Sequence, residues 1–205
     1  MSSVDQLVRL TRWRGPRQTD ADWERAEEDL GIALPLDFRE LAERFPDGVF
    51  QGYLDFSASP GSLVDLAEGP LEDLRRWRED APLSLPFPLW PEPGGIFPWT
   101  LGSRDEIFFW LRSDPDPSHW PVVWCHGEDF EWEQFAGSAT DFLIALVTGQ
   151  IDARKLGSPT FPPPPRFDQI AGLRYRPTAG SNPPSDEEIA RIKSLVRKAH
   201  PDAPI

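Results

Sequence analysis

Residues 91–110 read PEPGGIFPWTLGSRDEIFFW and place two prolines and two glycines directly ahead of a dense aromatic run. Proline and glycine favour tight turns, so the chain is expected to turn sharply here onto a strand. The run Ile107 to Trp110 shows no alternation of apolar and polar residues, which is typical of a strand buried on both faces. We therefore predict strands at Ile96 to Leu101 and at Glu106 to Leu111, near the centre of a sheet.

The segments around this stretch extend the sheet. A further strand is predicted at Trp120 to Cys125, and residues 131–135 could add a short edge strand. The linking sequences GSRD and RSDPDPSH are short enough for antiparallel hairpins. Earlier in the chain, an Asp-Gly turn precedes a single predicted strand from Val49 to Phe56.

Helical spacing of apolar residues flanks these strands. Helices are predicted over residues 3–12, 19–31, 34–45, from Pro70 onward and over 138–149. Together these patterns predict an α+β fold, in which a curved, mainly antiparallel sheet is flanked by helices from the N-terminal half and by residues 138–149.

The starts of three of these helices are predicted from capping chemistry. Thr19 is the expected N-cap of the second helix, with Asp22 three residues later as a capping-box partner. Pro70 is expected to open its helix, because proline is tolerated in a first helical turn. Ser138 is the expected N-cap of the last of these helices, and Asp141 follows it at the capping-box spacing.

The composition changes after residue 157. The sequence SPTFPPPPRF favours polyproline II, and a last amphipathic helix is predicted within 185–200. We therefore divide the chain into a domain over 1–157, with a core at about 17–150, and an extension over 158–205. The apolar stripe of the terminal helix could dock on the domain or on a partner.

The charge is distributed unevenly along the chain. The net charge is −13, but residues 159–205 contain seven basic and five acidic residues. Residues 1–158 therefore hold 14 basic and 29 acidic residues, a net charge of −15. Such a domain repels nucleic acid and attracts basic proteins, although an acidic surface can also serve solubility alone.

Composition also bears on the cellular compartment. No window approaches eighteen uninterrupted apolar residues, so no membrane association is expected. The N-terminal sequence lacks the apolar region of a secretory signal, and a single cysteine, Cys125, cannot form an internal disulfide. A cytoplasmic location is the expectation.

Cys125 and its polar neighbours could be imagined as a reactive or metal-binding group. The candidates are Cys125, His126 and His119 with Asp114, Asp116, Glu128 and Asp129. Their spacing matches no zinc pattern, and adjacent residues of a strand point to opposite faces. We therefore expect a buried cysteine and solvated acids, with no metal, no cofactor and no catalytic residue.

Four segments in order resemble the SUKH superfamily, and within it the small Smi/Knr-type proteins common in bacteria. They are WERAEEDLGIALPLDFRELAERFPDGVF, FPLWPEPGGIFPWT, EIFFWLRSDPDPSHWPVVW and FAGSATDFLIALVTG. The likeness covers about residues 17–150. The stretch TLGSRDE departs from the plainer turn of the relatives, and the likeness does not reach the extension.

The resemblance implies a binding protein and no enzyme. Members of the superfamily are typically immunity proteins that block a toxin, often a nuclease, so the expected partner is a basic protein toxin. Charge and loop position suggest the contact residues Asp114, Asp116, Glu128, Asp129 and Glu131, with Trp90 as an aromatic anchor. The alternative is an intracellular adaptor or regulatory scaffold, in which the extension would dock partners.

Overall fold

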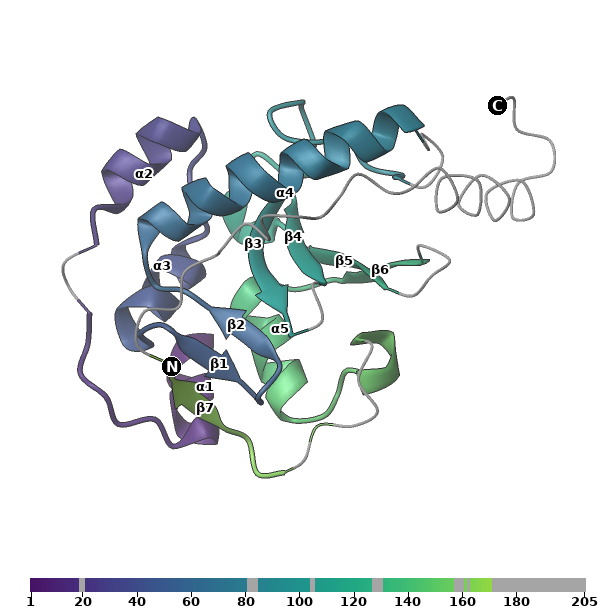
Figure 1. Cartoon of the computed structure of the whole chain (residues 1–205). Helices are drawn as coiled ribbons and strands as arrows, with labels where there is room; N and C mark the ends of the chain where they lie inside the picture. The colour runs from purple at the N-terminus through teal and green to yellow at the C-terminus, as the bar shows by residue number, and fades with distance from the viewer. Residues whose placement is uncertain are drawn as a thin grey trace.

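The computed structural model describes residues 1–18, 21–80, 85–103, 106–126, 131–156, 161 and 163–170. These residues form an α+β fold in which one seven-stranded sheet is covered by helices (Figure 1). The sheet order is β6-β5-β4-β3-β2-β1-β7, and every neighbouring pair is antiparallel. The predicted fold class is confirmed.

The centre of the sheet is the aromatic stretch with which the sequence analysis began. β3 (Ile96–Gly102) pairs with β4 (Ile107–Leu111), and β4 pairs with β5 (Val122–His126). Phe108, Phe109 and Trp110 are almost completely buried. The absence of alternation in this run therefore reflects burial on both faces, as predicted.

The predicted strand from Val49 to Phe56 is wrong in one respect, because it is a hairpin of two strands. β1 (Gly48–Phe50) pairs with β2 (Leu54–Phe56). Gln51 and Gly52 between them have φ angles of 57° and 65°, which reverse the chain direction. The apolar pattern continues through the turn because Tyr53 is itself buried, and this hides the break.

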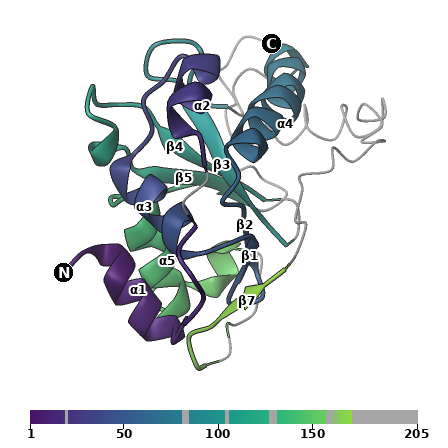
Figure 2. The ribbon, with the colours of Figure 1, turned by 90° about the vertical axis from the view of Figure 1, so that its left-hand side faces the viewer.

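Helices cover both faces of the sheet (Figure 2). On one face lie α1 (Ser3–Thr11), α3 (Leu36–Arg44) and α5 (Ala139–Val147). On the other face α4 (Pro60–Asp80) packs along β3. α2 (Trp23–Leu30) contacts α4, and its Trp23 ring also contacts the Phe38 ring of α3. The Phe38 ring of α3 contacts the rings of Trp99 and Trp110, which places the aromatic core between this helix and the sheet.

Two predicted helix starts differ from the structure. The N-cap of α2 is Asp22, whose carboxylate accepts a hydrogen bond from the Arg25 amide; Thr19 lies outside the described residues. Pro70 does not open a helix but lies inside the 21-residue α4. Burial of Leu63, Leu66 and Leu71 along one side of α4 outweighs the backbone hydrogen bond that proline cannot make.

The end of the described chain also belongs to the sheet. β7 (Phe167–Gln169) pairs with β1, although no strand is predicted beyond residue 157. The Phe167 ring contacts the rings of Trp13, Phe45 and Phe50. The predicted terminal helix within 185–200 lies outside the described residues.

Candidate functional site

Two loops meet at one end of the sheet. The backbone of Leu89 bridges to Ile96 at the start of β3, and Ile96 pairs with Leu111 at the end of β4. The loop over residues 85–95 and the loop over 112–121, which joins β4 to β5, therefore lie at the same end. We call this region the β4–β5 loop end; it contains the predicted site residues Trp90, Asp114 and Asp116.

Hydrogen bonds hold Asp114 and Asp116 in fixed positions. The Asp114 carboxylate accepts from the Asp116 amide (2.8 Å), and its Oδ1 lies 3.5 Å from His119 Nδ1. Asp116 caps the short helix η2 (Pro117–His119) and accepts from the amide (2.9 Å) and the hydroxyl (2.7 Å) of Ser118. Trp120 closes the loop, since its indole donates to the Asp114 carbonyl (2.7 Å).

The same contacts favour the charged form of Asp116. The Ser118 hydroxyl, and then the Ser118 amide, lower the pKa of the exposed Asp116 carboxylate. Hydrogen bonds donated to a carboxylate stabilise its anion, so this group stays negative well into the acidic range. Within the described residues, neither Asp114 nor Asp116 forms an ion pair with lysine or arginine.

Trp90 lies at the same end of the sheet and is partly buried. Its ring meets the Phe97 ring edge-on at 5.8 Å, and its carbonyl accepts from the Arg75 guanidinium (3.0 Å). A side chain at Gly95 would meet the Leu89 and Trp90 backbone at 2.6 Å, so the loop folds back closely on itself. Trp90 therefore packs into this end of the sheet and keeps part of its surface exposed.

Glu131 is separated from Asp114 and Asp116. It begins β6 (Glu131–Phe135) and pairs with His126, whereas the 112–121 loop enters β5 at Val122. The two positions are therefore at opposite ends of β5, about 14 Å apart along a five-residue strand. Glu128 and Asp129 lie outside the described residues.

The helix N-termini beside the loop carry functional candidates that were not predicted. The Asp37 carboxylate in the first turn of α3 accepts from the Thr140 amide of α5 (3.1 Å), and α3 also contacts η2. The Asp141 carboxylate accepts from the Ser3 hydroxyl of α1 (3.0 Å). Carboxylates at helix N-termini are stabilised by the helix dipole, so further negative charge is fixed at this end.

Leu36, the first residue of α3, places an apolar side chain beside Asp37. It is 72% exposed, one of three large hydrophobic side chains that stand out from the surface of the described residues. Leu36 lies on the opposite side of the helix from the buried repeat Phe38, Leu41, Ala42 and Phe45, so its exposure agrees with the helical spacing, although the sequence analysis did not single it out.

Cys125 lacks the surroundings of a nucleophile. Burial raises the pKa of its thiol to about 12, so the thiol stays protonated at neutral pH. Among the described residues, no group of three or more histidine, cysteine, aspartate or glutamate side chains is placed to hold a metal ion.

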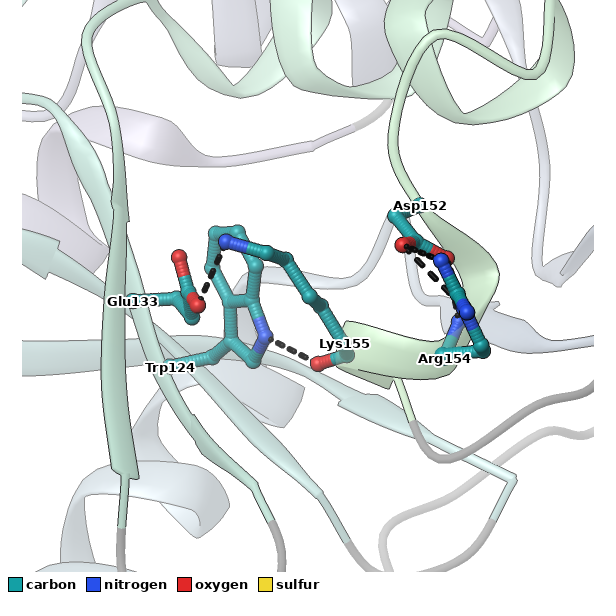
Figure 3. Close-up of polar contacts among 5 residues, drawn as sticks. All are labelled: Trp124, Glu133, Asp152, Arg154 and Lys155. Atoms are coloured by element: carbon teal, nitrogen blue, oxygen red, sulfur yellow. Dashed lines mark hydrogen bonds and ion pairs between the residues drawn. The ribbon is translucent and has the colours of Figure 1, made fainter.

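The segment that follows α5 packs against β5 and β6. In Figure 3 the Trp124 indole donates to the carbonyl of Lys155 (2.8 Å), and the Lys155 ammonium pairs with Glu133 (2.6 Å). Both contacts fasten η3 (Ala153–Leu156) over β5 and β6. Beside them, hydrogen bonds from the Arg154 side chain lower the pKa of Asp152 to about 2. These charges are matched within the chain.

A family model described as the SMI1 / KNR4 family (SUKH-1) matches residues 18–145. The matched range includes α2, α3, the aromatic strands and both loops of the β4–β5 loop end. The chain belongs to the SMI1/KNR4 family (SUKH-1). The resemblance read from the sequence is thereby confirmed. No curated protein and no solved structure gives a significant match.

The family domain is extended on both sides in this chain. α1 precedes the matched range, and η3 and β7 follow it. The SMI1/KNR4 (SUKH-1) family is compatible with the role of an immunity protein, and its members are generally not enzymes. Within the described residues, no helix combines the length and the apolar character needed to cross a bilayer.

Proposed function

We propose that this SMI1/KNR4 family member is a cytoplasmic immunity protein that binds and blocks a toxin with a basic surface, such as a nuclease. The observation that carries the proposal is the β4–β5 loop end, where Asp114 and Asp116 are held by hydrogen bonds and form no ion pair with any lysine or arginine that the structure describes. A basic cleft that accepts phosphates would accept such carboxylates.

Preorganisation supports binding at this end. Ordering a mobile acidic side chain at an interface costs binding free energy, whereas Asp116 is already fixed by Ser118. The net charge of −15 over residues 1–158 would also speed encounter with a basic partner.

The acidic surface of α2 and α4 is a weaker candidate for the toxin contact. α2 and α4 expose several carboxylates, and some of them are paired, Asp29 with Arg25 and Glu72 with Arg75 and Arg76. Within the described residues Glu24 and Glu28 of α2 form no ion pair, but their carboxylates are also not held by hydrogen bonds like those that fix Asp116. Carboxylates already paired within the chain attract an external cation less strongly. We therefore place the toxin contact at the β4–β5 loop end, with Leu36 as an exposed apolar neighbour.

The proposal is tested by capturing partners from the native host on the immobilised full chain and eluting them with increasing salt. We expect a basic protein that elutes with salt, arrests growth when expressed alone in a test bacterium, and is harmless when co-expressed with this chain. A captured partner that is neither toxic nor basic would contradict the proposal and would favour the adaptor function instead.

A further inference from the structure

Arg112 has an unusual environment at the β4–β5 loop end. Its guanidinium lies over the Trp120 ring, with the central carbon 5.7 Å from the ring centroid. Its Nε and Nη1 atoms are shielded from solvent and have no hydrogen-bond partner. Three N–H bonds of a charged group are therefore unpaired in a partly buried position.

Such a group is costly to the free protein. Burying an unpaired donor of a charged group destabilises the fold, and burial lowers the pKa of Arg112, which nevertheless remains protonated at neutral pH. The chain has 34 acidic residues, yet the nearby Asp114 carboxylate is bonded to the Asp116 amide and faces His119. Within the residues that the structure describes, the Trp120 ring is the only partner found for this guanidinium.

The surroundings of Arg112 favour one class of anion. Trp110, two residues earlier, contacts the Trp120 ring and also has a shielded indole nitrogen without an acceptor. Arg112 and Trp110 therefore both have shielded N–H donors without an acceptor. Asp114 and Asp116 nearby would repel a multiply charged phosphate more strongly than a single carboxylate, so a carboxylate is the better match.

We propose that Arg112 is a receiving site for a carboxylate of the toxin, an aspartate, a glutamate or a chain terminus set within its basic surface. This inference rests on the proposed function. Arg112 as a whole is only partly buried, so turning the side chain on the Trp120 ring brings its donors to a ligand. The site would make binding selective, because a basic partner without this carboxylate would leave the guanidinium unpaired.

The first test is an NMR titration of the free full-length protein with sodium acetate at constant ionic strength. The Arg112 Nε–H resonance, assigned by its loss in Arg112→Lys, is expected to shift saturably, with half the change below about 100 mM acetate. The exposed Arg14 provides the matched control resonance. An equal response to chloride, or an equal response at Arg14, would overturn the proposal.

The second test separates binding from a structural role. Arg112→Met keeps the apolar contact with Trp120 and removes the unpaired donors, so the melting temperature is expected to stay the same or rise. A fall of more than about 4 °C would show that Arg112 supports the fold and would contradict the assignment. Because both tests use the protein alone, their failure would leave the toxin-binding proposal standing.

Discussion

Cys125 and Asp116 lie nine residues apart and show how the surroundings set the chemistry of a side chain. Burial raises the pKa of the Cys125 thiol to about 12, whereas hydrogen bonds from Ser118 lower the pKa of the Asp116 carboxylate. The first group is thereby kept neutral and the second charged. The sequence alone predicts a buried cysteine, but it does not predict the Ser118 contacts, which depend on the turn geometry of the loop.

The partly buried thiol of Cys125 should be unreactive. At pH 8 a thiol of pKa about 12 has a thiolate fraction on the order of 10⁻⁴, so alkylation of native Cys125 by iodoacetamide should be about 10³-fold slower than in the urea-unfolded chain. The measurement is the labelling rate followed by mass spectrometry. Native and unfolded rates within tenfold of each other would contradict this account of the site.

The Ser118 contacts should be visible in the titration of Asp116. Replacing Ser118 with Ala should raise the Asp116 pKa towards its ordinary value, as measured by NMR of the carboxyl carbon against pH. Because the folded pKa is the lower one, the stability linked to this group is present above the unfolded pKa and is lost as pH falls through the folded pKa. Ser113→Ala, in the same loop, is the control and should leave the titration unchanged.

At the scale of elements, β7 shows how segments outside the family match complete the fold. Phe167 is 8% exposed and fills a space among Trp13, Phe45 and Phe50, while β7 covers the edge of β1. Two hydrogen bonds also join Arg166 to Gln51. The Arg166 backbone amide donates to the Gln51 side-chain oxygen (3.0 Å), and the Gln51 backbone amide donates to the Arg166 carbonyl (3.1 Å). An unpaired strand edge invites aggregation, so this cover protects the sheet.

This arrangement predicts a large effect of a single substitution. Phe167→Ala should lower the free energy of unfolding in urea by about 3 kcal/mol, because it leaves a cavity among aromatic rings. The control is Ile170→Ala, three residues away and 42% exposed, for which a change within about 0.5 kcal/mol is expected. Equal effects of the two substitutions would show that β7 is not packed as described.

The comparison of sequence and structure is also clearest at this scale. Local signals were sufficient where one pattern dominates, as in the buried run Phe108–Trp110 and the Ser138–Asp141 capping box of α5. They failed where tertiary burial overrides a local rule, as at Pro70 inside α4, or where a turn residue is itself buried, as at Tyr53. β7 was missed because three residues after a proline run carry too little pattern.

At the scale of the whole molecule, acidic residues are spread along the chain, but the fold decides which of them share a surface. Acids predicted from charge and loop position fall at both ends of β5, since Asp114 and Glu131 flank different ends of the strand. Net charge can be counted from a sequence, but which acids share a surface depends on strand order and on the helix starts that meet the loop. Asp37 illustrates this, because its contact with Thr140 joins residues 103 positions apart.

The account's central claim is that the β4–β5 loop end binds a basic partner, and the affinity of the captured partner tests it most directly. The dissociation constant is measured against salt for the native chain, for Asp114→Asn with Asp116→Asn, and for Glu24→Gln with Glu28→Gln on α2, which removes the same charge elsewhere. We predict at least about tenfold weaker, less salt-dependent binding for the loop variant and less than about threefold weakening for the α2 variant. Equal weakening by both variants, or none by the loop variant, would contradict the claim.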